Sequence, residues 1–553
     1  MRRLHPTSGV ISVTQAMFQG AFLGFFVGTA LAGTGSLPVV SLPGLALGGA
    51  ALFGAYAGAR YLRFRYEIEG GTLAVESGVF ARQSREIPLG RIQNVDVRQG
   101  VLNRVLGLAV VEFETAGGSA TEATLDAVEM AEAKRLRGLV QRHDRAAEPD
   151  RSGADRAETE PDGETSTTPS VDSATELFAF GPRELLTYAV VSVRPAAPVL
   201  TLVGLPLGQD LVFAVLRFNV RFVGAGDTVG LPILRDTAVP RLAALAGLTL
   251  LQFLAVALVV SAVLTVFEYY GFRLVRDGDD LQYERGLLRR YSGTIPLAKV
   301  QTVTVRENVL MRRFGYATLV VETAGYAASS QGSTQGVAVP MAPRDTVYDL
   351  ARDIEPFGEL VFERPPTRAR RRYAVRFGLV AGVLTAVAYG VDRFLLQTGA
   401  WWVVLGLLVL AVPAAHLRWR HRGYALDDDA VATRTGFWRR TTRVVPYYRI
   451  QTVFVGRSPF QRWRHLATLS ADTASTASVL GGDARAYDLD EGTATELRET
   501  LRERLYGDLL ERGRQRSGRE DRIAESDSAV DTQAGTAAET PPDEPAPDDS
   551  PDE

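Results

Sequence analysis

The chain has 553 residues, of which 46% are hydrophobic, and its 61 basic and 64 acidic residues nearly cancel. This composition is typical neither of an ordinary soluble protein nor of a membrane protein made only of spans. The absence of cysteine excludes disulfides, thiolate metal sites and a cysteine nucleophile. The five histidines form no pair at metal-ligand spacing, so we expect no metal and no cofactor.

Lys134 and Lys299 are the only lysines, and every other basic residue is arginine. This bias is typical of a high-GC, salt-adapted organism, in which dense carboxylates keep acidic surfaces hydrated. Plain codon bias explains it equally well.

The chain begins with two almost uncharged segments, from about Val13 to Gly33 and from about Leu42 to Tyr61. Each is near the roughly 20 residues that cross a hydrocarbon core, so they predict a transmembrane hairpin over residues 1–62. Arginines flank its outer ends and none lies in its short connection, which places both ends in the cytoplasm. The alternative is a signal peptide cleaved after Ala30-Leu31-Ala32, but the apolar run is too long for most such peptides.

Glycines recur at every fourth position of this hairpin, at Gly20, Gly24 and Gly28 and again at Gly44 and Gly48. Small residues at this spacing let two helices pack closely. The alternative interpretation is that glycine is simply common in membrane spans.

A block that follows the hairpin occurs three times without gaps. It reads GVFARQSREIPLGRIQNVDVRQG from Gly78, GLLRRYSGTIPLAKVQTVTVREN from Gly286 and GFWRRTTRVVPYYRIQTVFVGRS from Gly436. One proline and one glutamine keep their places in every copy, as Pro88, Pro296 and Pro446 and as Gln93, Gln301 and Gln451. The chain must therefore contain one folding unit that is used three times.

Each unit has the pattern of a small antiparallel sheet closed by a helix. Alternating or β-branched runs such as Tyr66–Ile68 and Val110–Thr115 are separated by glycine-rich turns. The segment after Asp126 carries apolar residues at helical spacing. We expect the three units over residues 63–145, 269–357 and 419–508, the third being divergent.

The remaining segments are two further hairpins and two acidic stretches. Hairpins are predicted over residues 177–268 and 358–418, with spans near Leu185–Leu207, Leu242–Phe267, Tyr373–Val391 and Trp401–Leu417. Because Arg194-Pro195 interrupts the third span, its true position could lie nearer to Val215. Residues 146–176 and 509–553 have too few large apolar side chains to order, which predicts a linker and a tail. The prediction is six spans, with both termini and all three units in the cytoplasm.

The recurring glutamine lies in phase with valines on one face of a strand, as Gln93 does with Val95 and Val97. We expect its amide to be buried and hydrogen-bonded to the backbone at a bend. A recurring arginine and a recurring acid predict an ion pair within each unit, Arg104 with Glu114, Arg312 with Glu322 and Arg462 with Asp472. The alternative is that these charges are unrelated on the surface.

Two further sets of recurring cations form the candidate interaction surface: Arg82, Arg290 and Arg440, and Arg91, Lys299 and Arg449. Juxtamembrane cations are attracted to lipid phosphates by about 1 kcal/mol each. In molar salt, however, the screening length falls to about 3 Å, so only direct contacts would count.

An apolar hairpin followed by IPLGRIQNVDVRQG and VVEFETAG resembles the bacterial and archaeal pleckstrin-homology-like (PH-like) membrane proteins of the YdbS and YdbT type. The resemblance covers most of the chain outside the acidic segments. The third copy departs from it, with His465 in place of Gly107 and Gly315. The resemblance implies an α+β membrane protein in which each hairpin precedes a bent antiparallel sheet capped by a helix. It implies no catalytic residues, and phosphoinositide binding does not follow from the fold.

Three functions are compatible with the residues. The first is a non-enzymatic scaffold whose cytoplasmic units bind partner proteins, each other or lipid headgroups, with the resemblance suggesting envelope homeostasis or resistance to membrane-active peptides. The second is a transporter component, for which Gln252 and Arg194 are the polar span residues. The third is a lipid enzyme, for which no acid, base or metal set is visible. We expect membrane lipids and a membrane or cytoplasmic protein as partners, a possible oligomer, and no nucleic acid.

Overall fold

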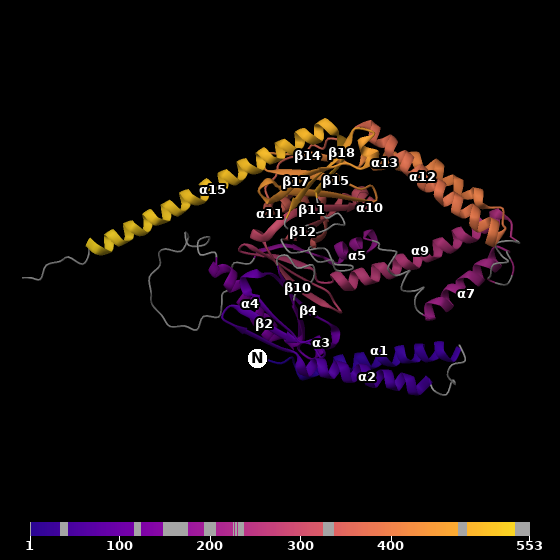
Figure 1. Cartoon of the computed structure of the whole chain (residues 1–553), viewed down its shortest axis with the longest axis horizontal. Coiled ribbons are helices and arrows are strands. Elements are labelled where there is room, and N and C mark those ends of the chain that lie inside the picture. Colours follow the sequence, from indigo (N-terminus) through magenta and orange to yellow (C-terminus); the bar gives the residue numbers. More distant parts are fainter. Residues whose placement is uncertain are drawn as a thin grey trace, which may run out of the picture.

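Three β-sheet units stack on one another, and the hairpin helices α1, α2, α9, α12 and α13 leave them on one side, whereas α15 (Glu491–Thr536) leaves on the opposite side (Figure 1). The computed structural model describes residues 2–33, 42–115, 123–147, 175–192, 206–224, 226, 229, 237–323, 337–473 and 484–536. The first unit follows α1 (Pro6–Gly33) and α2 (Leu42–Arg63), the second follows α9 (Val239–Tyr269), and the third follows α12 (Thr367–Val391) and α13 (Gly406–Arg420).

Five helical segments in the described part of the chain are long and apolar enough to cross a membrane, not six. They comprise α1, α2, α9, α12 with the π-helical turn Asp392–Leu396, and the 3-10 turn Trp401–Leu405 with α13. The predicted third span corresponds to α5 (Pro182–Val191) and α7 (Pro206–Phe222), whereas residues 193–205 lie outside the described residues. The difference arises because α7 has only 17 residues and carries Asp210, Arg217 and Arg221.

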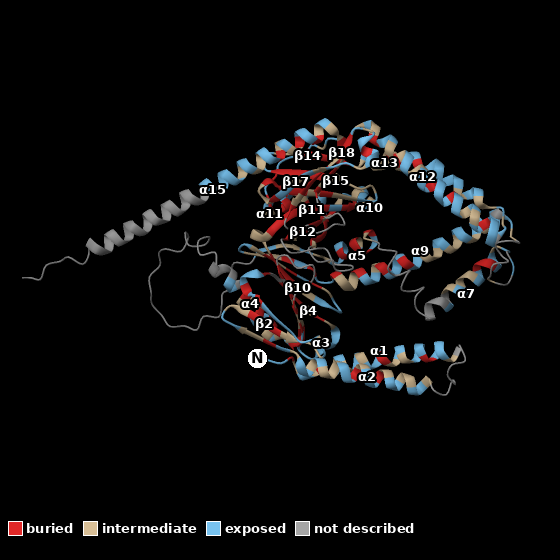
Figure 2. Ribbon diagram, viewed as in Figure 1, coloured by how far each residue is buried: buried red, intermediate tan, exposed pale blue. Residues whose placement is uncertain are grey.

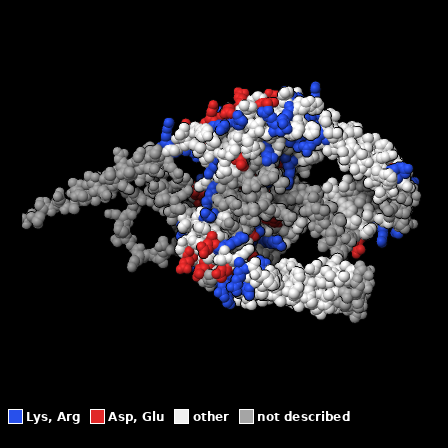
Figure 3. All heavy atoms as spheres, in the orientation of Figure 1, with Lys and Arg blue, Asp and Glu red and all other residues white. Residues whose placement is uncertain are grey.

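The surfaces of the five candidate spans are apolar although they are exposed. Figure 2 shows the buried residues concentrated in the sheets, and Figure 3 shows an uncharged surface along the first hairpin with arginines gathered near its base. Phe18, Leu251 and Val409 are among many large apolar side chains open on these helices. Contiguous exposed apolar surface marks a site of protein or membrane contact, and on helices long enough to span it favours the membrane.

The two helices of the first hairpin pack closely through glycine on the face of α1 that carries Gly20 and Gly24, as predicted. A Cβ atom on Gly20 would lie 2.2 Å from the carbonyl oxygen of Gly49, and one on Gly24 would lie 2.2 Å from that of Leu45. The helices therefore approach to a distance that only glycine permits. Gly44 and Gly48 do not take part, because nothing lies within 4 Å of either.

Each unit consists of three strands, a short 3-10 turn, three more strands and a closing helix. In unit 1 these are β1 (Arg65–Glu69), β2 (Thr72–Ser77), β3 (Gln83–Pro88), β4 (Ile92–Gln99), β5 (Leu108–Thr115), β6 (Ala123–Glu129) and α4 (Met130–Ala147). In unit 2 they are β8 (Arg273–Asp277), β9 (Asp280–Arg285), β10 (Arg290–Pro296), β11 (Val300–Asn308), β12 (Tyr316–Thr323), β13 (Val337–Pro343) and α11 (Arg344–Ile354). In unit 3 they are β14 (Gly423–Leu426), β15 (Ala430–Thr435), β16 (Arg439–Pro446), β17 (Ile450–Gly456), β18 (Leu466–Thr473), β19 (Ala484–Asp490) and α15 (Glu491–Thr536).

A one-turn helix also follows the fourth strand of every unit. These helices are α3 (Val101–Val105), α10 (Val309–Phe314) and α14 (Pro459–Arg462). The turn after them needs a left-handed residue, which is Gly107 (φ 68°), Gly315 (φ 75°) or His465 (φ 52°). The divergent third unit thus keeps the local geometry without the glycine.

The segment before each hairpin pairs with the first strand of the unit that follows it. Arg2 and Tyr66 exchange backbone hydrogen bonds of 2.7 and 3.0 Å, and Glu363 and Tyr424 exchange bonds of 2.8 and 3.1 Å. In unit 2 the same place is taken by β7 (Thr175–Ala179), which pairs with β8. Both ends of every hairpin are therefore fixed to one sheet edge.

The recurring proline and glutamine mark the corner between the two halves of a unit. Each proline ends the third strand, and the glutamine lies at a register shift between the fourth and fifth strands, at Gln93, Gln301 and Gln451. Gln301 is buried, and its amide donates to Lys299 O at 3.5 Å. Gln451 is exposed, so burial was wrong for the third copy, and the Gln93 side chain lies outside the described part.

The predicted linker and tail need two corrections. Residues 148–174 lie outside the described residues, but Thr175 and Glu176 already belong to β7. The predicted disordered tail begins as helix, because α15 continues to Thr536. Helix-forming Arg, Glu and Leu residues and the pair Arg512–Asp508 at i, i+4 support this extension.

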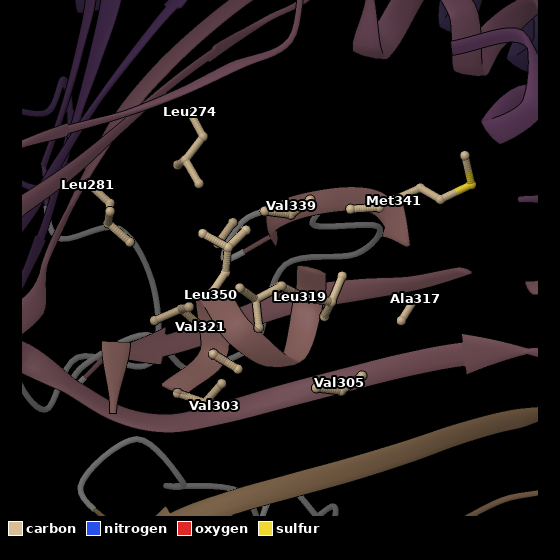
Figure 4. Packing of buried hydrophobic residues seen from close by; sticks show 14 of the residues in the cluster. Leu274, Leu281, Val303, Val305, Ala317, Leu319, Val321, Val339, Met341 and Leu350 are labelled. Carbon is tan, nitrogen blue, oxygen red and sulfur yellow. The ribbon is translucent and has the colours of Figure 1, made fainter. Parts of the chain in front are cut away.

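The sheets do not end where the units end. The strand order is β6-β5-β4-β10-β9-β8-β7 in one sheet and β13-β12-β11-β16-β15-β14 in the next, with three-stranded sheets β1-β2-β3 and β17-β18-β19 at the two ends. The fourth strand of one unit therefore pairs with the third strand of the following unit, and we call each such pairing a joint. The buried core of unit 2, drawn in Figure 4, continues across the second joint to Ala430, Ala432 and Val444.

Candidate functional site at the joints between units

The two joints have the same geometry. At the first joint β4 pairs antiparallel with β10, with Ser292 opposite Val97 and Arg290 opposite Gln99. At the second joint β11 pairs with β16, with Thr442 opposite Val305 and Arg440 opposite Glu307. These residues occupy equivalent positions of the repeat, so one register is used twice.

The first recurring arginine reaches forward to the next unit. Arg104 Nη1 donates to Leu287 O at 3.5 Å, and Arg312 Nη2 donates to Phe437 O at 2.6 Å. Leu287 and Phe437 are equivalent, so this contact also occurs at both joints. In unit 3 the exposed Arg462 makes no side-chain hydrogen bond or ion pair within the described residues.

The second recurring cation reaches back to the preceding unit. Lys299 Nζ donates to Ile92 O at 3.1 Å, and Arg449 Nη2 donates to Ala298 O at 2.6 Å. Arg91 has no preceding unit, and it is exposed without a hydrogen bond or ion pair to any described residue.

The third recurring cation has a different environment in each copy. Arg440 donates to both carboxylate oxygens of Glu307 across the second joint, at 2.7 Å each. Arg290 instead pairs with Glu284 of its own unit at 2.9 Å. Arg82 is exposed and, like Arg91, has no partner among the residues described.

The closing helices add contacts that no repeat pattern indicated. Arg137 on α4 donates to Ser292 Oγ at 2.8 Å and also to Gly293 O and Thr294 Oγ1 of unit 2. Burial lowers the pKa of this guanidinium. At the second joint the Tyr448 hydroxyl donates to Glu355, just after α11, at 2.9 and 3.1 Å. Burial raises the pKa of Glu355, and this hydrogen bond opposes the shift.

The predicted ion pairs within units are absent in units 2 and 3, where the structure describes both partners. Arg312 turns to the next unit, and Glu322 lies 3.8 Å from Arg306 on the adjacent strand. Glu322 lies opposite Thr302, near the start of β11. Arg312 lies on α10, which follows the other end of β11, so the two side chains are far apart along the strand. In unit 3 both Arg462 and Asp472 are described and no ion pair joins them, whereas the Glu114 side chain in unit 1 lies outside the described part.

His421 lies at the second joint, just after α13. Its Nδ1 is 3.5 Å from Arg312 Nη1, and its ring packs against Phe437. Burial, followed by the positive charges of Arg312 and Arg440, lowers the pKa of His421 to about 4. The imidazole is therefore neutral at neutral pH and can accept a hydrogen bond from the arginine.

The base of the third hairpin holds a buried ionic network. Asp488, at a left-handed φ of 58°, accepts from Arg372, Tyr373, Gln461 at 2.7 Å and Arg422 at 3.2 Å. These donors come from both helices of the hairpin and from unit 3. A cavity of about 600 Å³ lies beside them, lined by Phe377, Leu417, Arg418, Arg422, Trp438 and Arg439.

The polar span residue Gln252 has a structural partner. Its amide oxygen accepts from Asn219 Nδ2 at 2.7 Å, and the same Nδ2 is 3.0 Å from Thr249 Oγ1. Such contacts hold membrane helices together. Arg194, the other candidate for a transport path, lies outside the described residues.

Sequence reasoning identified the recurring cations but not that they join consecutive units. Arg137 and Asp488 were missed because each has its contacts far away in the sequence. The sequence did hold a signal for Asp488. Arg372 and Arg422 lie at the two ends of the third hairpin, and if these ends meet, the two arginines need a shared carboxylate.

Comparisons with known proteins agree with this architecture. The chain is 24% identical over 431 residues to the UPF0699 transmembrane protein YdbT of Bacillus subtilis (strain 168), covering 76% of this chain and 81% of that protein. It is also 36% identical over 91 residues to the UPF0699 transmembrane protein YdbS of the same organism, covering 16% of this chain and 55% of that protein. No solved structure matches the chain. The bacterial PH domain model matches residues 21–144, 233–356 and 375–505, so the chain belongs to the bacterial PH domain family and carries this domain three times.

Proposed function

We propose that the protein is a membrane-anchored, non-enzymatic scaffold whose three PH-like units act as one continuous layer on the cytoplasmic side of the membrane. The observation that carries this proposal is the pairing of β4 with β10 and of β11 with β16. Units joined by main-chain hydrogen bonds, and in the case of units 2 and 3 also by a common core, hold a fixed spacing, which a set of flexibly tethered modules does not.

The direction of the hairpins supports a single membrane face. All three leave the sheet layers on the same side (Figure 1), and the arginines near the bases of the first and third hairpins fit a cytoplasmic location of the units. The six spans predicted from the sequence would place all three units on this one side of the membrane. A role in envelope homeostasis or resistance to membrane-active peptides would use this layer as a platform.

The partner surface that we propose is the outer face of unit 1. Lys299, Arg440 and Arg449 donate hydrogen bonds between units, whereas the equivalent residues of unit 1, Arg82 and Arg91, make no contact of this kind with any described residue. Free cations on a rigid layer favour an acidic protein segment or a lipid phosphate as ligand.

The test is affinity purification of the full-length protein from its native membrane in high salt, with mass spectrometry of bound proteins and lipids. A stoichiometric protein that is lost with Arg82→Ala and Arg91→Ala, and kept with Arg290→Ala, would support the scaffold. Arg290 is the matched control because it is exposed but paired within its own unit. A protein-free preparation that supports substrate flux in vesicles would instead favour the transporter.

A second candidate function is lipid binding at the base of the third hairpin. The cavity there combines apolar walls with Arg418, Arg422 and Arg439, and Arg422 Nε has no hydrogen-bond partner in the described part. An anionic lipid would place its phosphate among these guanidinium groups and its chains along Phe377. Retention of phosphatidylglycerol but not phosphatidylcholine in native mass spectra, reduced by Arg439→Ala, would support this function. Equal retention of both lipids would argue against it.

A further inference from the structure

Among the residues that the structure describes, units 1 and 3 each hold one half of a joint that is not used. Every joint needs the fourth strand of one unit and the third strand of the next, so within the described part of the chain the third strand of unit 1 and the fourth strand of unit 3 have no joint partner. These are β3 and β17, the edge strands of the two three-stranded sheets. Edge strands with open main-chain groups are templates for pairing with another chain.

The two edges are more exposed than the equivalent strands at the internal joints. Residues 83–86 of β3 are all exposed, and Phe454 of β17 is 44% exposed. The equivalent of Phe454 in unit 2, Thr304, is 0% exposed because the second joint covers it. The same strand position is thus buried wherever a following unit exists.

We propose that β17 of one copy pairs antiparallel with β3 of a second copy, in the register of the internal joints, so that chains associate head to tail. Val455 then lies opposite Ser84, as Val97 lies opposite Ser292 and Val305 opposite Thr442. This inference rests on the proposed scaffold function, because it names the partner that extends the layer.

The side chains around the two edges are complementary. Arg498 occupies the position on α15 that Arg137 occupies on α4, since Met130 and Glu491 begin these helices with the same backbone bond to the turn residue. Arg137 reaches Ser292 and Thr294, whose equivalents on β3 are Ser84 and Glu86. Arg498 therefore meets a hydroxyl and a carboxylate.

Two further arginines fit the same pairing. Arg462 has the position from which Arg104 and Arg312 reach the next unit. The register also brings Arg82 opposite Arg457, which pairs with Glu491. Glu491 then takes the role that Glu307 has at the second joint, and its carboxylate pairs with both Arg457 and Arg82.

A head-to-tail contact between different edges closes into a ring or grows into a filament. Because the hairpins of all copies must enter one membrane, growth stays within the membrane plane. The area of the layer would then exceed that of one chain.

Cysteine cross-linking in the full-length chain tests the register directly, because the natural sequence has no cysteine. Two differently tagged copies are co-expressed, one with Ser84→Cys and the other with Val455→Cys. We expect a disulfide-linked product that carries both tags. The matched control replaces Val455→Cys by Thr452→Cys, which moves the thiol roughly 10 Å along the strand and out of reach. Equal cross-linking of the control would overturn the proposed register.

An internal pair separates this inference from the scaffold itself. Val97→Cys with Ser292→Cys in one chain should cross-link across the first joint. If this internal pair fails, the continuous layer and the proposed function fail with it. If it forms and the Ser84–Val455 product does not, only the head-to-tail association is overturned.

Charge exchange gives a second readout. Arg498→Glu should lower the Ser84–Val455 yield roughly fivefold, and Glu86→Arg in the other copy should restore it. A Val455→Cys product with a different polypeptide, and none with Ser84→Cys, would assign the β17 edge to another protein and overturn the inference.

Discussion

Arg440 and Glu307 form a two-pronged ion pair across the second joint, with both N–O distances 2.7 Å and the carboxylate only 1% exposed. A buried carboxylate that loses its partner keeps its desolvation penalty. Arg440→Ala should therefore lower the free energy of unfolding by about 3 kcal/mol, because Arg344 remains 3.8 Å from Glu307. Thermal unfolding in detergent measures the loss. The control Arg290→Ala removes an exposed pair and should change stability by less than about 1 kcal/mol, so equal losses would contradict a special role for Arg440.

Arg137 connects α4 to unit 2 through three oxygen acceptors. Arg137→Met keeps much of the side-chain volume but leaves these acceptors without a charged donor, which we expect to cost about 2 kcal/mol. Limited proteolysis between units 1 and 2 should become faster in the variant. The control is Arg135, which pairs with Glu132 of the same helix and contacts no residue of unit 2 in the described part of the chain. Arg135→Met should leave the cleavage rate unchanged.

The second joint should weaken in mild acid because of His421. Its pKa of about 4 in the folded protein lies below the ordinary value of 6.5, so the unfolded chain binds the proton more readily. Stability is unaffected above pH 6.5 and should fall as the pH drops from 6.5 toward 4. His421→Gln should flatten this part of the stability curve relative to wild type. The exposed His465 provides the control, and an identical slope in His421→Gln and His465→Gln would refute the assignment.

The contact between Gly20 and Gly49 should tolerate no side chain. Gly20→Val places carbon 2.2 Å from a backbone oxygen, so α1 and α2 must separate, at a cost of about 2 kcal/mol. Gly48→Val is the matched substitution in the same hairpin, where nothing lies within 4 Å. Unfolding temperatures of the two variants in detergent should differ by several degrees. No difference between them would show that the helices do not pack through this face.

Asp488 should be needed to fix the third hairpin to unit 3. Asn tolerates the left-handed backbone, so Asp488→Asn removes the charge without backbone strain and leaves Arg372 and Arg422 without their carboxylate. We expect a loss of about 3 kcal/mol in the free energy of unfolding. Asp490→Asn breaks the exposed pair with Arg368 and should cost less than about 1 kcal/mol. Denaturant titration of both variants separates the two outcomes.

The sequence by itself determined the repeat, the membrane hairpins and the internal order of each unit. These features depend on local chemistry: apolar runs long enough to span, alternation that specifies strands, and a proline and glutamine at a fixed corner. The register shift occurs both at the buried Gln301 and at the exposed Gln451, so it accompanies the repeated proline and glutamine whether or not the amide is buried.

Only the tertiary structure decided what the recurring cations contact. Periodicity cannot distinguish a fourth strand that closes its own unit from one that pairs with the next, because both bury the same face. Lys299, Arg440 and Arg449 therefore looked like a surface set, although each reaches a neighbouring unit. Their partners are mostly backbone carbonyls, which leave no trace in the residue pattern, and only the folded chain brings them within hydrogen-bond distance.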